Sequence, residues 1–111
     1  MSELQTIKRE FKVASNFLVA VGDQKRQAII LALLNDKVCD GLRVTELTKA
    51  TNLSRPAVSH HLKILKQANI VNFKSVGTKN YYFLAPNTKE IDKLQKLLNN
   101  ITGVMKRKLQ K

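Results

Sequence analysis

The sequence predicts a mainly α-helical chain with one small β-hairpin. Apolar residues recur at helical spacing over about residues 3–21 and 88–109, near the two ends of the chain. Two shorter helical stretches joined by a tight turn occupy about residues 44–69, which is the pattern of a helix-turn-helix. Two runs rich in β-branched and aromatic residues follow around a glycine, over about residues 70–85. Five helices with the hairpin in this order form a winged helix-turn-helix, in a single domain of residues 1–111.

The first helix carries a narrow apolar seam, and the second helix is apolar on all sides. The seam has a 3-4-3-4-3 spacing that suits helix-on-helix packing and consists of Leu4, Ile7, Phe11, Ala14, Leu18 and Val21. Asp23 can cap the second helix, whose residues 28–33 are a run of six apolar side chains. We therefore expect the second helix to be the central, most buried one. Residues 35–41 are expected to form a loop that contains Cys39.

The third and fourth helices are predicted from their apolar faces and their ends. Residues 44–51 are expected to form a short helix, and Asn52 and Leu53 form a tight link to the next one. The Ser54 hydroxyl can accept from free amides of the fourth helix, and Pro56 is tolerated in that first turn. One side of this helix gathers Ala57, Val58, Leu62, Ile64, Leu65 and Ala68. Short polar and basic groups opposite suit a DNA major groove, although such a face is more often simply solvated.

The hairpin and the last helix complete the pattern. Residues 42–44 are expected to form a short first strand, and strands over 70–75 and 80–84 surround a turn in which Gly77 supplies positive φ. Asn87, with Glu90 three residues later, predicts a capping box for the last helix. A second apolar seam follows, made of Ile91, Leu94, Leu98, Ile101 and Met105 and reinforced by Leu97 and Val104.

The charged residues indicate which kind of partner the protein binds. Twenty Lys and Arg against eight Asp and Glu give a net charge of +12, which points to a polyanion. No acidic residue occurs between Leu47 and Lys89, so beyond Glu46 the charged residues of the helix-turn-helix and hairpin are all basic, and nucleic acid is favoured over an acidic membrane surface. No carboxylate in this stretch can orient His60 or His61, so an enzyme is not expected. The sequence shows neither a membrane span nor a signal peptide, and we expect a cytoplasmic protein.

The central motif also resembles a known family. Residues 53–65 (LSRPAVSHHLKIL), followed by residues 68–71 (ANIV), Gly77 and the pair Tyr81-Tyr82, resemble the ArsR/SmtB family of small dimeric bacterial repressors. The resemblance covers residues 44–84 closely and the flanking helices by length and order only. It implies a winged-helix homodimer that blocks transcription and releases DNA when an inducer binds.

The residues expected to contact DNA lie on the helix-turn-helix and the wing. They are Thr45, Ser54, Arg55, Pro56, Ser59, His60, Lys63, Lys66, Lys74, Thr78 and Lys79. Arg55 can grip guanine O6 and N7, with a phosphate contact as its alternative. The resemblance implies base contacts for Ser59 and His60, whereas His61 falls on the apolar face and is expected to be half-buried. Family wings often carry arginine after the glycine, so Thr78 argues against deep insertion into the minor groove.

The two terminal seams are expected to pair across a two-fold axis. The expected interface residues are Leu4, Ile7, Phe11, Leu18, Ile91, Leu94, Leu98, Ile101 and Met105. Packing of both seams on their own domain is the alternative. A dimer suits DNA reading, because two recognition helices reach half-sites about one turn, ~34 Å, apart.

The expected partners are double-stranded DNA and a second copy of the chain, with no cofactor and an unassigned inducer. Direct binding of a transition metal as the inducer is not favoured, because His60 and His61 are adjacent on one helix and the last helix has neither His nor Cys. Cys39 is either a redox handle or a small buried hydrophobe. The alternative function is a winged helix that binds double-stranded RNA or a ribosome.

Overall fold

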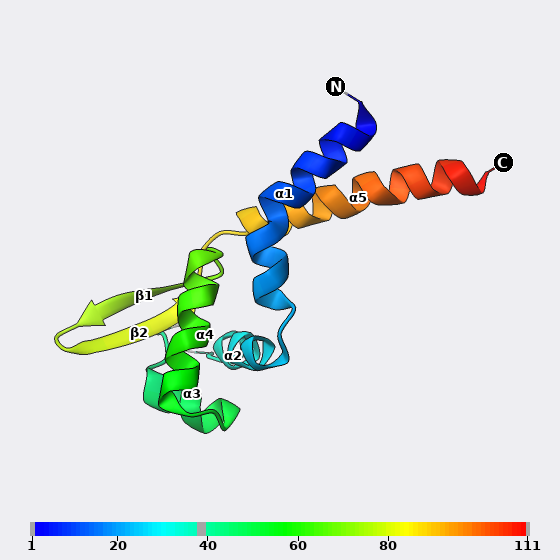
Figure 1. Ribbon diagram of the computed structural model, residues 1–111. Coiled ribbons are helices and arrows are strands. Elements are labelled where there is room, and N and C mark those ends of the chain that lie inside the picture. The colour runs from blue at the N-terminus through cyan, green and yellow to red at the C-terminus, as the bar shows by residue number, and fades with distance from the viewer. Residues whose placement is uncertain (1, 38–39, 111) are drawn as a thin grey trace. The chain divides into compact units, whose positions relative to one another are not determined.

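A computed structural model describes residues 2–37 and 40–110 (Figure 1). The chain divides into two compact units. We call Asn16–Pro86 the winged-helix unit, and Met1–Ser15 together with Asn87–Lys111 the helical unit. Helix α1 (Glu3–Val21) contributes its first part to the helical unit and its last part to the winged-helix unit.

The winged-helix unit contains three further helices and a two-stranded antiparallel sheet. Their bounds are α2 Gln24–Leu34, α3 Val44–Thr51, α4 Arg55–Gln67, β1 Val71–Val76 and β2 Lys79–Leu84. One cluster of buried side chains joins these elements and the end of α1, and it consists of Ala20, Ile29, Leu33, Leu47, Val58, Leu62, Leu65, Ala68 and Val71. The predicted mainly α fold with a small hairpin is confirmed.

The turns of this unit follow from local chemistry. Asp23 caps α2 by accepting from the amides of Lys25 and Arg26 at 2.9 and 3.0 Å. Asn52 ends α3 in the left-handed region at φ 59°, where asparagine is tolerated, and so redirects the chain into α4 within three residues. Gly77 has φ 63° at the first position of the two-residue turn between Val76 and Lys79, as a type II′ turn requires.

The expected first strand is only a single bridge. Leu42 exchanges both backbone hydrogen bonds with Tyr82 at 2.8 Å, but residues 42–44 form no strand. Val44 instead begins α3, and the Glu46 side chain accepts from the Arg43 amide at 3.1 Å and fixes that helix start. Because Arg43 is the N-cap residue of α3 and Val44 is its first residue, only Leu42 pairs with β2.

Helix α2 is not buried on all sides, so that expectation was wrong. Ile29 and Leu33 are buried, but Leu31 and Leu34 are each 64% exposed. The rest of the unit covers only one face of α2, because α3, α4 and β2 all contact it within a single small core. An unbroken apolar run gave no information about which face would be covered.

The helical unit pairs the first part of α1 with α5 (Lys89–Leu109). Ile7, Ala14 and Leu97 are buried. Asn100 Nδ2 donates to Glu10 Oε1 at 2.7 Å, and Arg107 forms an ion pair with Glu3. These two polar contacts join residues about 90 and 100 positions apart.

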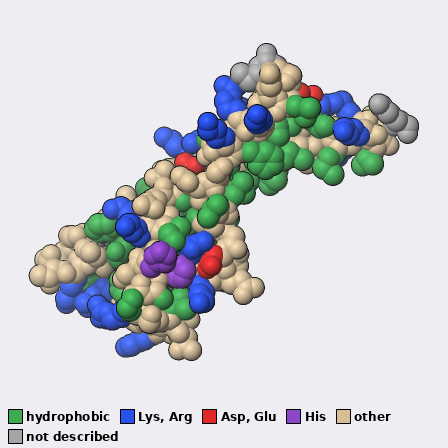
Figure 2. All heavy atoms as spheres, viewed as in Figure 1, with side chains coloured by type: hydrophobic (Ala, Val, Ile, Leu, Met, Phe, Trp, Pro, Cys, Tyr) green, Lys and Arg blue, Asp and Glu red, His purple; other side chains and the backbone are tan. Residues whose placement is uncertain are grey.

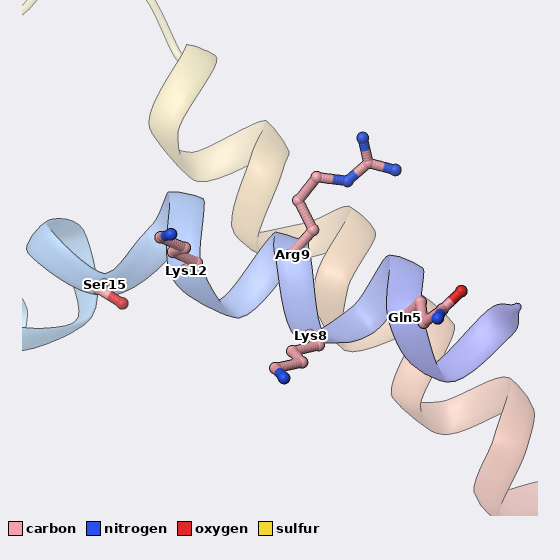
Figure 3. A pocket seen from close by; sticks show the side chains of 5 residues that line it. All are labelled: Gln5, Lys8, Arg9, Lys12 and Ser15. Atoms are coloured by element: carbon pink, nitrogen blue, oxygen red, sulfur yellow. The ribbon is translucent and has the colours of Figure 1, made fainter. Parts of the chain in front are cut away.

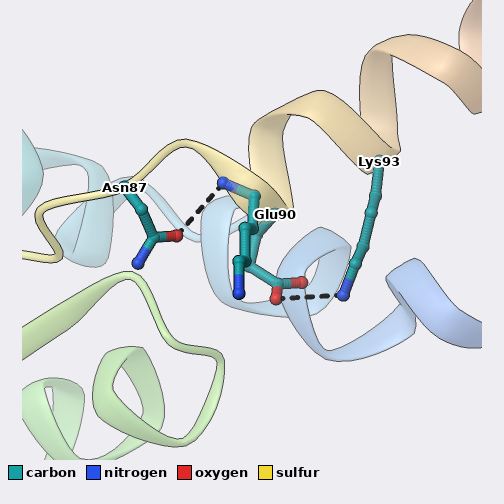
Figure 4. Close-up of polar contacts among 4 residues, drawn as sticks. Asn87, Glu90 and Lys93 are labelled. Carbon is teal, nitrogen blue, oxygen red and sulfur yellow. Dashed lines mark hydrogen bonds and ion pairs between the residues drawn. The ribbon is translucent and has the colours of Figure 1, made fainter.

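The predicted capping box at the start of α5 is absent. Thr88 is the N-cap residue and makes no side-chain capping bond, while Asn87 Oδ1 accepts from the Lys89 amide at 3.2 Å (Figure 4). Glu90 pairs with Lys93 at 3.4 Å instead of reaching back to Asn87.

Within the described residues, no helix is both long and apolar enough to cross a membrane.

Candidate nucleic-acid interface

Helix α4 presents a polar and basic face to solvent. Val58, Leu62 and Leu65 hold it in the core, which leaves the opposite side uncovered. The exposed residues of this side are Arg55, Pro56, Ser59, His60, Lys63 and Lys66. In Figure 2, several Lys and Arg side chains lie near the histidine pair on this unit, among apolar, acidic and other atoms. The helix can therefore offer guanidinium, ammonium, hydroxyl and imidazole groups to a polyanion.

The start of α4 is fixed by Ser54. Its Oγ accepts from the Ala57 amide at 3.2 Å, as the sequence predicts. Its hydroxyl hydrogen remains able to donate to a phosphate. Arg55 follows as the first residue of the helix and is exposed. Thr45, in the first turn of α3, is half-buried, and its carbonyl accepts from the Thr48 hydroxyl at 2.6 Å.

Lys66 makes a contact that sequence reasoning missed. Its Nζ lies 4.2 Å from the centre of the Phe73 ring on β1. The ammonium is thereby held against the base of the wing by a cation–π interaction. Phe73 also packs against Tyr82 of β2 with ring centres 5.4 Å apart and the rings tilted by 40°. Lys66 thus links α4 to the wing. The feature of the sequence that could have indicated this contact is the aromatic residue Phe73 within the first strand of the hairpin.

The wing carries its basic residues at and near its tip. Lys74, Thr78 and Lys79 are all exposed. Ser75 Oγ donates to Asn80 Oδ1 at 2.6 Å, which ties the two strands together just before the turn. The paired strands therefore hold Lys79 at a defined place beside the turn at Gly77.

His61 lies on the other side of α4, where it meets Arg26 of α2. The guanidinium donates to the carbonyls of Ala20 and Val19 at 2.8 and 3.1 Å, and Nη1 lies 3.3 Å from His61 Nδ1. Arginine can only donate, so Nδ1 accepts in this contact. Burial lowers the pKa of His61, Asp23 partly opposes this, and Arg26 adds to it. His61 is half-buried, as expected, but the sequence gave no sign of its arginine partner.

The described residues contain no group of three or more His, Cys, Asp or Glu side chains arranged to hold a metal ion. The two histidine rings are tilted at 57° with centres 5.6 Å apart. Asp92 of α5 accepts from the Thr88 hydroxyl at 3.0 Å. Cys39, the candidate redox residue, lies outside the described residues.

Comparisons with known proteins agree with this geometry. Residues 23–72 match the model of the family described as "Bacterial regulatory protein, arsR family". An uncharacterized HTH-type transcriptional regulator of Methanocaldococcus jannaschii is 37% identical over 87 residues, which cover 77% of this chain and 93% of that protein. A transcriptional repressor SmtB homolog of Synechocystis is 36% identical over 73 residues, which cover 66% of this chain and about half, 52%, of that protein.

A solved structure shows the same fold. The ArsR-like transcriptional regulator from Rhodococcus sp. RHA1 superposes with a TM-score of 0.75 at 22% identity, over 99% of this chain and 91% of that one. The fold, the exposed basic recognition helix and the sequence matches lead to one conclusion: the chain belongs to the ArsR family of DNA-binding transcriptional regulators.

Proposed function

We propose that the protein is a homodimeric repressor that binds a pseudo-palindromic DNA operator through α4 and the wing. The observation that carries this proposal is the α4 surface. Its helix start is fixed by Ser54, its apolar side is anchored in the core, and its basic side is exposed. A rigid, basic helix of this kind suits the width of the major groove.

We assign different roles to the exposed side chains of the interface. Arg55 lies in the first turn of α4, where a recognition helix contacts base edges, so we assign it the base contact. Ser59 and His60 continue the same exposed side. Lys63, Lys74 and Lys79 are exposed ammonium groups, which suit phosphates better than bases. Lys66 is assigned to positioning the wing, because its ammonium already lies over Phe73.

The apolar side chains of the helical unit support the dimer. Within this unit Leu4 is 68% exposed, Phe11 47%, Leu98 51% and Met105 56%. At about 100° per residue, Ile91, Leu98, Met105 and Leu109 fall within about 40° of one another on α5. A continuous exposed apolar strip of this kind marks an interaction surface. A second copy of the chain supplies a matching strip, because a two-fold interface pairs the same surface of both subunits.

The predicted interface divides into two groups. Ile7 is only 8% exposed and already contributes to packing within the chain, and Leu94, Ile101 and the Leu18 side chain are half-buried. The exposed residues of the expected set, which we assign to the partner contact, are Leu4, Phe11, Ile91, Leu98 and Met105.

Selection of bound sequences from random double-stranded DNA tests the proposal. A homodimeric repressor should enrich an inverted repeat with half-sites about one helical turn, ~34 Å, apart. The measurement should be repeated at two salt concentrations, because non-specific phosphate binding falls steeply as salt rises. Enrichment of a single unrepeated site would contradict the dimer. Equal binding of all DNA sequences, with tighter binding of double-stranded RNA, would favour an RNA-binding winged helix.

A further inference from the structure

The helical unit carries as much excess positive charge as the winged-helix unit, although it is much smaller. Each unit contains ten Lys and Arg against four Asp and Glu, over 40 residues in the helical unit and 71 in the winged-helix unit. All of the proposed DNA contacts belong to the winged-helix unit. The proposed DNA contacts therefore do not explain the excess positive charge of the helical unit. A concentration of like charge attracts anions.

A hollow of about 280 Å³ lies within the helical unit, between α1 and α5. Its lining residues are Thr6, Arg9, Glu10, Val13, Lys93 and Lys96. At about 30 Å³ per water molecule, it has room for about nine waters or for one small organic molecule. A wider hollow of about 730 Å³ runs along α1 beside Lys8 and Lys12, and Arg9 lines both hollows (Figure 3).

The lining combines cations with an apolar wall that consists of one side chain, that of Val13. Three cations line the hollow beside the carboxylate of Glu10, which already accepts from Asn100 at 2.7 Å, and one of them, Lys93, also pairs with Glu90 at 3.4 Å. A guanidinium offers two parallel donors that match a carboxylate, so Arg9 is suited to bind one. Val13 is 54% exposed and supplies an apolar surface beside these cations.

The hollow stays accessible when the apolar strip is covered. At about 100° per residue, Arg9 lies about 150° around α1 from the midpoint of Leu4 and Phe11. By the same spacing, Lys96 lies about 160° around α5 from Leu98. In Figure 2, apolar side chains follow one side of this unit and Lys and Arg side chains the other. The proposed dimer contact and the hollow thus use opposite sides of the helix pair.

We infer that the hollow between α1 and α5 binds an organic monocarboxylate. Arg9 and Lys96 hold the carboxylate, and Val13 contacts the hydrocarbon part. A simple inorganic anion would use the cations without the apolar wall, and a nucleic-acid phosphate would do the same. These alternatives are separated by the choice of probe.

Calorimetric titration of the full chain with octanoate tests the inference. Octanoate should bind saturably at one site per chain. Octanamide, which has the same hydrocarbon part without the charge, should bind at least about tenfold more weakly, because charge-assisted hydrogen bonds are lost. Inorganic phosphate should also bind more weakly. Equal affinity for octanamide or for phosphate, or no saturable octanoate binding, would overturn the inference.

Two pairs of substitutions locate the site. Arg9→Gln with Lys96→Gln should weaken octanoate binding at least about tenfold. The matched control is Lys106→Gln with Lys108→Gln, which removes the same charge from exposed positions at the far end of α5 and should change binding less than about twofold. Equal weakening by both pairs would mean a diffuse charge effect and would contradict the site.

Val13→Ser supplies a second test that leaves every charge in place. It should weaken octanoate binding while leaving the weak binding of acetate unchanged, because acetate has almost no hydrocarbon part to contact residue 13. An unchanged octanoate affinity would overturn the role of the apolar wall. All of these measurements are made without DNA, so their outcome is independent of the operator selection that tests the repressor.

Discussion

The winged-helix unit surrounds a core of fully buried large apolar side chains, although Leu31 and Leu34 of α2 are exposed, whereas the helical unit leaves many of its own large apolar side chains exposed. Ile29, Leu47, Val58 and Leu65 are 0% exposed in the former, while Leu98 is 51% exposed in the latter. The difference has a geometric cause. Three helices and a hairpin can surround a common core, but two paired helices each cover only one stripe of the other.

Because of this difference, we expect folding and assembly to depend on different regions of the molecule. Residues of the winged-helix core should determine whether the unit folds, and they already have all their contacts. Exposed apolar residues of α5 contribute little to the isolated chain and are available to a partner. Substitutions in the two regions should therefore have different consequences, which the following variants distinguish.

Leu98→Glu should have the largest effect on assembly. A carboxylate placed in the apolar strip would be buried against apolar side chains in the dimer, at a cost of several kcal/mol. The dimer should dissociate, the winged-helix unit should remain folded, and operator binding should fall toward the sequence-independent level. Analytical ultracentrifugation of mutant and wild type at the same micromolar concentration measures this.

Asn99→Glu is the matched control for Leu98→Glu. It adds the same charge at the next, exposed position, about 100° around α5, and should leave the dimer intact. A Leu98→Glu protein that still sediments as a dimer, or a wild type that is monomeric, would contradict the proposed interface.

Leu62→Ala should instead destabilise the fold. Leu62 is 1% exposed in the core cluster, and replacing such a leucine costs about 2–5 kcal/mol of unfolding free energy. Urea denaturation followed by circular dichroism measures the loss. Leu31→Ala on α2, where the side chain is 64% exposed, is the control and should change stability by no more than about 0.5 kcal/mol in the monomer.

Arg55→Ala should weaken operator binding by about 1–3 kcal/mol and relax the preference at one base position in each half-site. The physical reason is the loss of a bidentate contact to guanine from the first turn of α4. Binding measured on a set of single-base operator variants reveals the pattern. A uniform loss across all sequences would show that Arg55 contacts only phosphate.

Lys79→Ala should have a smaller effect that does not depend on DNA sequence. Loss of one phosphate contact should reduce the slope of log K against log salt by about one unit. Affinities for operator and random DNA should fall together. If the slope is unchanged over a salt series, the wing does not touch the DNA backbone at this residue.

The smallest expected effect is a pH dependence of stability that comes from His61. Its pKa in the folded protein lies below 6.5 because of burial, with Arg26 contributing and Asp23 opposing. The unfolded chain therefore binds the proton more tightly, so stability should fall as the pH drops below about 6.5 toward the folded-state pKa. Protonation also turns Nδ1 into a donor that faces the Arg26 donor.

His61→Gln should flatten this part of the stability–pH curve, measured by urea denaturation between pH 5 and 8, roughly the range in which histidine titrates. His60→Gln is the matched control, because it removes the neighbouring exposed imidazole and leaves the Arg26 contact in place. A curve that is equally steep for wild type and His61→Gln would contradict the role of His61.

Sequence by itself determined the five helices, the hairpin and the motif, because the forces involved act between near neighbours. Asp23 and Ser54 bond amides only two or three residues away, so their capping roles follow from local order. Gly77 marks the hairpin turn because few other residues tolerate its φ. The helix-turn-helix and the family resemblance, both carried by a contiguous stretch, were predicted for the same reason and are confirmed.

Only the tertiary structure decided which apolar faces are covered and which distant side chains meet. The run in α2 is equally apolar on all sides, so no periodicity could tell that Leu31 would be exposed and Ile29 buried. Lys66 meets Phe73, and Arg26 meets His61 across 35 positions of the chain. Such contacts depend on how helices and strands pack in three dimensions, and spacing along one helix carries no information about them.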